Sequence, residues 1–202
     1  MRDKLAQLRL DTTQIGLNWQ AGLDDKLLHL ADLLQERSQH TNLVGDPSPT
    51  GLCEHVLEAF CVGALAQTVL GHDPDKIADI GAGAGLEGIA LALMWPNTQV
   101  VAVEQRRLRY EFIQLVQREL QLQNLEVKGM SLFSAQLPAD IELATARAVW
   151  PEHQWLPRAR AIVRAGGLIA LHGRAPASDW ADVTAALDVS GARGHAVAVV
   201  RV

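Results

Sequence analysis

The sequence predicts an α/β fold in which a mostly parallel sheet carries helices on both faces. Short apolar runs alternate with segments of helical periodicity through most of the chain. A glycine-rich turn joins the first apolar run, which ends at Asp79, to a helical segment that begins at Leu86. The second apolar run, Val100–Val103, ends in an acid, Glu104. This order is typical of a βαβ unit that binds a nucleoside-type ligand at the carboxyl ends of its strands.

The first third of the chain is expected to be a helical extension. Leucines recur at helical spacing through residues 3–37, and a second helical pattern covers residues 52–70. The segment between them is polar and contains Pro47 and Pro49, so it predicts a loop. The expected organisation is an extension over residues 1–70, packed on a core over residues 71–202 as one compact unit.

The core elements follow from apolar runs and their boundaries. The helix at 107–120 is strongly amphipathic, with Leu108, Phe112 and Leu115 in register. Gly166 opens the fifth strand, and Ser178 suits the N-cap of a late helix. We expect strands at 77–80, 100–103, 125–128, 141–146, 168–171 and 196–202, and helices at 86–94, 107–120, 151–163 and 179–187.

Composition narrows the functional classes. The 202 residues are 49% hydrophobic, enough for a sizeable core, and their net charge of −5 does not suggest a protein that coats nucleic acid. No apolar run looks long enough to cross a bilayer, and the N-terminus lacks the apolar centre of a secretory signal. Cys53 and Cys61 fall on one expected helix, too far apart to bridge. A cytoplasmic protein with reduced thiols and no metal site is therefore expected.

The charge of the glycine turn favours one cofactor over others. A glycine-rich turn after a strand fits NAD, FAD or S-adenosylmethionine. Dinucleotides place a pyrophosphate on the helix N-terminus, and Asp79 would oppose it there. S-adenosylmethionine has no phosphate and carries a cationic amine and a sulfonium, so Asp79 and, more weakly, Glu87 favour it. Glu104 can accept hydrogen bonds from two ribose hydroxyls. In the alternative interpretation, Asp79 only braces the loop and Glu104 is an ordinary strand end.

Several ordered blocks resemble the glucose-inhibited division protein B family, the small-subunit ribosomal RNA guanine-N7 methyltransferases. The resemblance runs from about Asn42 to Gly173. The glycine block followed by Ala-Arg-Ala-Val at the fourth strand is its most specific part. The blocks are Asn42-Leu43, Asp46-Pro47, His55-Val56-Leu57-Glu58, Asp79-Ile80-Gly81-Ala82-Gly83-Ala84-Gly85-Leu86, Gly88-Ile89, Thr145-Ala146-Arg147-Ala148-Val149 and Gly166-Gly167.

The resemblance implies a class I S-adenosylmethionine-dependent methyltransferase, Rossmann-like, with a seven-stranded sheet whose last strand is antiparallel. It implies a guanine of 16S ribosomal RNA in the small subunit as the acceptor. A monomer is expected. The residues expected to contact S-adenosylmethionine are Asp79, Gly81, Gly83, Gly85, Leu86, Glu104 and Gln105.

Arg147 and Asn42 are the residues expected to act on the acceptor. Guanine N7 carries a lone pair and no proton, so its methylation needs alignment rather than a general base. Arg147 follows the fourth strand, beside the methyl donor, and a guanidinium can donate to guanine O6 or to a phosphate. A structural salt bridge is the alternative for Arg147. Asn42 either hydrogen-bonds the base or braces its loop.

Some positions depart from the family pattern and keep other functions open. Glu87 stands where the family usually has proline, His172 where it usually has lysine, and Met130-Ser131-Leu132 where it usually has Arg-Ala-Glu. Glu104 replaces the more common aspartate, and Val44 replaces threonine. One alternative is therefore a methyltransferase of the same fold that acts on a small molecule or a protein. The other is a non-catalytic module that binds the cofactor.

Overall fold

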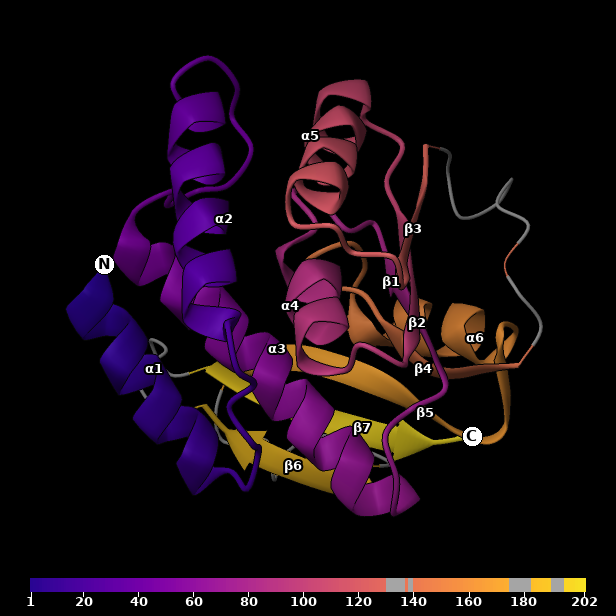
Figure 1. Ribbon diagram of the computed structural model, residues 1–202. Coiled ribbons are helices and arrows are strands. Elements are labelled where there is room, and N and C mark those ends of the chain that lie inside the picture. Colours follow the sequence, from indigo (N-terminus) through magenta and orange to yellow (C-terminus); the bar gives the residue numbers. More distant parts are fainter. Residues whose placement is uncertain (130–136, 138–139, 175–182, 190–194) are drawn as a thin grey trace.

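A single sheet organises the described part of the chain. The computed structural model (Figure 1) describes residues 1–129, 137, 140–174, 183–189 and 195–202, and its strands lie in the order β3-β2-β1-β4-β5-β7-β6. The first five strands are parallel, and β7 is antiparallel to both β5 and β6. This confirms the predicted class I fold, with its seven-stranded sheet and antiparallel last strand. The strands are β1 (Lys76–Ile80), β2 (Gln99–Val103), β3 (Leu125–Lys128), β4 (Ile141–Thr145), β5 (Val163–Arg174), β6 (Ala185–Asp188) and β7 (His195–Arg201).

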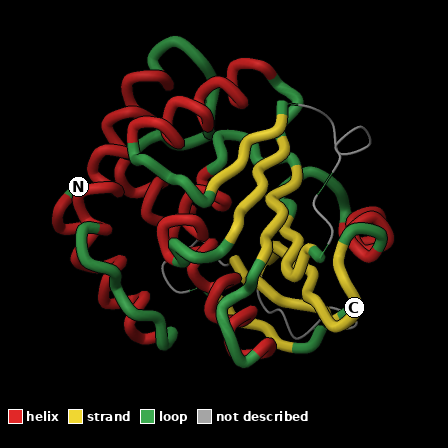
Figure 2. The backbone as a smooth tube through the Cα atoms, turned by 45° about the vertical axis from the view of Figure 1, so that its right-hand side comes forward, coloured by secondary structure: helices red, strands yellow, loops and turns green. Residues whose placement is uncertain are grey.

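Helices lie on both faces of the sheet, as predicted. The elements α3, α4 and α5 lie on one face, while α6 lies on the other (Figure 1). Figure 2 shows the described helices gathered mostly on one side of the strands. The helices are α1 (Arg2–Gln14), α2 (Leu23–Ser38), α3 (Pro49–Leu70), α4 (Leu86–Met94), α5 (Arg107–Glu119) and α6 (Glu152–Arg160).

The central strands are apolar because both of their faces are buried. Successive side chains of a strand point to opposite faces, so Ile77 and Val100 belong to the core under α3, α4 and α5. Ala78 and Val101, one residue later, pack with Trp155 in the core under α6. A parallel sheet covered on both sides gives such continuous apolar runs, and the carboxyl ends of its strands are left to form a site.

The first part of the N-terminal extension forms two helices where the sequence predicted helical structure throughout residues 3–37. α1 ends at Gln14 and α2 begins at Leu23. Gly16 and Gly22, both in the left-handed region with φ of 83° and 78°, break the helix between them. α3 begins slightly earlier than predicted, because Pro49 occupies its first turn and the Ser48 hydroxyl accepts a hydrogen bond from the Gly51 amide.

The helix predicted at residues 179–187 is wrong where the structure describes it. Residues 175–182 lie outside the described part, and Ala185–Asp188 forms strand β6, paired with β7. Ala185 and Leu187 are half-buried while Ala186 and Asp188 are exposed, which is the period of a strand. The apolar β7 offers this segment a ladder of hydrogen bonds, and that tertiary contact overrides the local helix preference.

The expectation that no segment is long enough to span a bilayer needs a correction. Among the described helices, α3 has the length and apolar composition of a membrane span. However, 67% of that apolar window is buried inside the protein, where α3 packs with α4 and the sheet in one core. A buried core helix meets the same criterion, so it is weak evidence for a membrane. Cys53 and Cys61 lie on α3 and are both unpaired, as expected.

Candidate functional site

The turn between β1 and α4 needs its glycines for different reasons. Gly81, Gly83 and Gly85 all adopt left-handed conformations, with φ of 69°, 62° and 75°. A Cβ on Gly81 would lie 2.5 Å from Val149 Cγ2, and one on Gly85 would lie 2.7 Å from Ile113 Cγ1. A Cβ on Gly83 would meet nothing closer than 3.9 Å. Gly81 and Gly85 therefore permit close packing, while Gly83 keeps open space above the turn.

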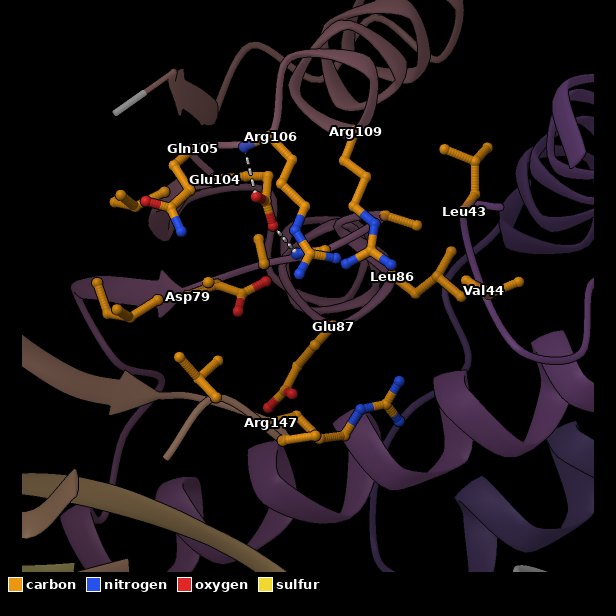
Figure 3. A pocket seen from close by; sticks show the side chains of 18 of the residues that line it. Leu43, Val44, Asp79, Leu86, Glu87, Glu104, Gln105, Arg106, Arg109 and Arg147 are labelled. Carbon is orange, nitrogen blue, oxygen red and sulfur yellow. Dashed lines mark hydrogen bonds between the residues drawn. The ribbon is translucent and has the colours of Figure 1, made fainter. Parts of the chain in front are cut away.

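That open space is a cavity of about 630 Å³ at the carboxyl ends of β1, β2 and β4 (Figure 3). Its volume falls in the range of roughly 300–1,000 Å³ that is usual for small-molecule sites. Most of the residues predicted from the sequence line it. Gly85 does not, because it caps α4 and packs on Ile113. The predicted residues in the wall are Asp79, Gly81, Gly83, Leu86, Glu104, Gln105 and Arg147.

Glu104 joins the two loops that bound the cavity. One carboxylate oxygen, Oε2, accepts a hydrogen bond from the Gly83 amide at 2.8 Å, and Oε1 accepts one from the Arg106 amide at 2.7 Å (Figure 3). The residue is 5% exposed. Each carboxylate oxygen has a second lone pair, so Glu104 can still accept hydrogen bonds from vicinal hydroxyls of a ligand.

Asp79 both braces the turn and lines the cavity. Its Oδ2 accepts a hydrogen bond from the Gly88 amide at 2.9 Å, in the first turn of α4. Burial and the nearby charge of Glu87 raise the pKa of Asp79 to about 7, against the opposing effects of Gly88, Arg147 and His172. A cationic ligand above Asp79 would favour its ionised form, so the site is suited to a sulfonium and an ammonium.

Arg147 reaches the cavity from the end of β4 and is held by α3. Its Nη1 donates to Glu58 Oε2 at 2.8 Å, and its Nη2 lies 3.5 Å from His55 Nε2. The next residue, Ala148, has a φ of 56°, a strained conformation that is often found at functional sites. Burial and the charge of Arg147 lower the pKa of His55 to about 4, so its ring in the cavity wall is neutral. The structure thus shows the salt bridge that was the alternative for Arg147, and the acceptor role of this residue stays a prediction.

A buried ion-pair network underlies the site and was only partly visible in the sequence. His172 donates from both ring nitrogens, to Glu58 Oε1 at 3.0 Å and to Glu87 Oε1 at 3.1 Å. Burial opposes the charge on His172, but the two carboxylates outweigh it and raise its pKa to about 10. Burial would also raise the pKa of Glu58, but His172 and Arg147 lower it to about 2. The sequence signal that could have revealed Glu58 is an acid on the otherwise apolar face of α3, because a buried acid needs a partner.

Some predicted positions fall elsewhere. Asn42 is exposed and outside the cavity wall, which is formed there by the next residues, Leu43, Val44 and Gly45. The role predicted for Asn42 stays a prediction. The departure at Met130–Leu132 lies outside the described residues. Trp150 lines the cavity, and its ring stacks on Trp155 and lies under Arg158.

The cavity fits S-adenosylmethionine better than a dinucleotide. Its wall holds both carboxylates and arginines, but the carboxylates of Asp79 and Glu104 are the side chains bonded to the glycine turn, where they would oppose a pyrophosphate. The Glu104 carboxylate, which follows β2, suits the hydroxyls of a ribose. The open space at Gly83 lets a ligand lie against the backbone. These features of the cavity wall favour a cationic nucleoside as the ligand.

Solved structures with the same fold include methyltransferases. The O-methyltransferase TomG from Streptomyces achromogenes, involved in tomaymycin synthesis and solved with S-adenosylmethionine, aligns with a TM-score of 0.55. It is 16% identical, and the alignment covers 94% of each chain. TYW2 from P. horikoshii, solved with MeSAdo, gives a TM-score of 0.55 at 18% identity, covering 76% of this chain and 63% of that one. At these identities the likeness shows a shared fold.

Sequence relatives define the family. The protein named ribosomal RNA small subunit methyltransferase G from Bordetella avium is 29% identical, over 93% of this chain and 85% of that protein. The protein of the same name from Alkalilimnicola ehrlichii is 27% identical, over 95% of this chain and 89% of that protein. A family model described as rRNA small subunit methyltransferase G matches residues 24–201. The chain therefore belongs to the GidB family of rRNA small subunit methyltransferases G, which confirms the resemblance seen in the sequence.

Proposed function

We propose that the protein transfers a methyl group from S-adenosylmethionine to N7 of a guanine in 16S ribosomal RNA of the small subunit. The family assignment confirms the predicted class of enzyme, an S-adenosylmethionine-dependent methyltransferase. One observation supports the proposal most strongly: a single cavity brings the predicted cofactor wall together with Arg147. We also propose that the protein acts in the cytoplasm as a monomer, with residues 1–70 as an extension of the core.

The strand order supports different roles for the two sides of the glycine turn. β1 lies between β2 and β4, so Glu104 at the end of β2 and Arg147 after β4 flank the glycine turn from opposite sides. Glu104 is positioned to hold a ribose, and Asp79 to face the sulfonium region. Arg147, on the other side, is then available to bind the guanine that accepts the methyl group. S-adenosylmethionine supplies the electrophilic methyl group when bound.

The described side chains suit an acceptor that loses no proton. The pKa of His55 is lowered to about 4, which makes its neutral ring a weak base, while Glu58 is fixed in ion pairs and His172 is held as a cation between two carboxylates. Guanine N7 needs no general base, since its lone pair attacks the methyl group directly. Arg147 can donate to O6 and align N7 with the methyl group, so its contribution is orientation and electrostatics.

Arginines at the cavity mouth provide a surface for RNA. Arg106 and Arg109 reach into the cavity from the start of α5 (Figure 3), and no described residue pairs with either guanidinium. A groove of about 230 Å³ between α2 and α5 continues from the cavity at Leu43, and Arg37 and Arg118 line it. Unpaired arginines along such a path suit phosphates, despite the acidic total charge.

Methyl transfer to purified small ribosomal subunits tests the proposal. We expect incorporation of labelled methyl into 16S RNA of subunits from a strain that lacks this protein, with N7-methylguanine identified by mass spectrometry. Naked 16S RNA, proteins and a panel of small nucleophiles serve as alternative acceptors. Methylation of a small molecule or a protein, with none of the RNA, would replace the proposed function by the first alternative.

The non-catalytic alternative has a separate test. Calorimetry with S-adenosylmethionine and S-adenosylhomocysteine measures whether the cavity is a working cofactor site. Tight binding of both, together with turnover on any acceptor, would exclude a purely structural module. Tight binding without turnover on any acceptor would support it.

A further inference from the structure

Glu87 lies in the first turn of α4, and only one of its carboxylate oxygens contacts other described side chains by a hydrogen bond or an ion pair. Oε1 accepts a hydrogen bond from the Thr145 hydroxyl at 2.5 Å and pairs with His172 Nε2 at 3.1 Å. Oε2 takes part in no hydrogen bond or ion pair among the residues that the structure describes. The side chain is 7% exposed and lines the cavity. This unused oxygen is open to the cavity, where a ligand can donate a hydrogen bond to it.

The anchors of Glu87 place it on the acceptor side of the cavity. Thr145 is the last residue of β4, and His172 lies near the end of β5. In the sheet order, β4 and β5 lie beyond β1 on the side opposite to β2 and Glu104. Figure 3 shows the Glu87 carboxylate turned toward Arg147 and away from Glu104.

Its surroundings keep Glu87 ionised. Burial alone would raise its pKa, but the charge and hydrogen bond of His172, the charge of Arg147 and the Thr145 hydroxyl together lower it. The N-terminal end of α4 adds a favourable partial positive charge. The free oxygen is therefore a hydrogen-bond acceptor that cannot donate.

We propose that Glu87 is a specificity-determining residue whose Oε2 accepts hydrogen bonds from the N1–H and exocyclic N2–H₂ groups of the acceptor guanine. This inference rests on the proposed function. Adenine carries a lone pair at N1 and lacks the N2 amine, so a carboxylate at this place repels it. Arg147 beside Glu87 suits guanine O6 and would oppose the adenine amine. A site built to hydrogen-bond one partner strongly rejects an analogue that leaves its polar groups unpaired.

The test compares Glu87→Gln with the wild type on small subunits that carry guanine or, by mutation of the 16S gene, adenine at the methylated position. We expect kcat/KM on the guanine substrate to fall at least tenfold. The preference for guanine over adenine should also narrow, because the glutamine amide can donate to adenine N1. Affinity for S-adenosylmethionine should stay within about twofold of the wild type. Glu126→Gln, on the exposed part of β3, is the control and should behave as the wild type.

A second variant separates recognition from packing. Glu87→Asp keeps the charge but shortens the reach, so it should lower kcat/KM while the preference for guanine stays high. An unchanged kcat/KM and preference in Glu87→Gln would overturn the inference. So would a loss of cofactor affinity with unchanged transfer, because Glu87 would then serve the donor. In either case the wild type still methylates the subunit; a wild type that does not methylate it would overturn the proposed function instead.

Discussion

Replacing Gly83 by valine tests whether the glycine turn cradles the cofactor. The added Cβ would lie 3.9 Å from its nearest neighbour, Arg109 Nη1, so the first atom of the new side chain meets no clash. Its cost in stability is that of a left-handed backbone, about 1–2 kcal/mol. The new side chain enters the cavity where a ligand would approach the backbone. We expect affinity for S-adenosylmethionine to fall at least a hundredfold, about 2.8 kcal/mol.

Gly71→Val is the matched control. Gly71 has a φ of 83° at the end of α3, and a Cβ there also meets nothing within 4 Å, but Gly71 lies outside the cavity. Thermal unfolding of both variants should show a similar loss of stability. Calorimetry with the cofactor should show a loss of affinity only in Gly83→Val. If Gly83→Val binds within threefold of the wild type, the turn does not hold the cofactor and the site assignment fails.

Three further substitutions test individual roles. Glu104→Gln removes the charge of a carboxylate that accepts hydrogen bonds from two loops and is proposed to bind the ribose. The affinity for the cofactor, measured by calorimetry, should therefore fall at least tenfold. Arg147→Ala should lower methyl transfer at least a hundredfold in the subunit assay and keep cofactor affinity, while the exposed Arg107→Ala should change neither. In the wild type, cofactor affinity should rise as pH increases through 7, because a cationic ligand lowers the pKa of Asp79 and binding releases its proton. Calorimetry in buffers of different ionisation enthalpy should detect that proton, and Asp79→Asn should abolish the signal.

The fold and the cofactor wall could be predicted because their signals are local. A left-handed turn requires glycine, and an acid at the end of a buried strand must lie at the edge of the sheet. Both rules apply to single short segments, and they bring Gly83, Asp79 and Glu104 to one cavity, as the structure shows, while their contact with the cofactor stays a prediction. The family blocks then added Arg147, which was predicted to act on the acceptor and which the structure brings into the same cavity.

The remaining features depend on contacts between distant segments. Glu58 and Arg147 are 89 residues apart, and no periodicity reveals that they pair. Asn42 is adjacent to the cavity in the chain, but the loop turns its neighbours inward and leaves Asn42 exposed. The segment Ala185–Asp188 has a local helix preference and becomes a strand because β7 is beside it. Local patterns carry no information about such partners.

Glu87 and His172 show why departures from a family pattern should be examined together. Taken singly, an acid in place of proline and a histidine in place of lysine both suggest a site that is losing its function. In the structure the two side chains are one ion pair, with His172 Nε2 3.1 Å from Glu87 Oε1. His172 also pairs with Glu58 Oε1 at 3.0 Å, so loss of Glu87 leaves His172 with one carboxylate, whereas loss of His172 leaves the buried Glu87 without its ion-pair partner. The two departures therefore belong to one network of charges with Glu58 and Arg147, and they should be interpreted together.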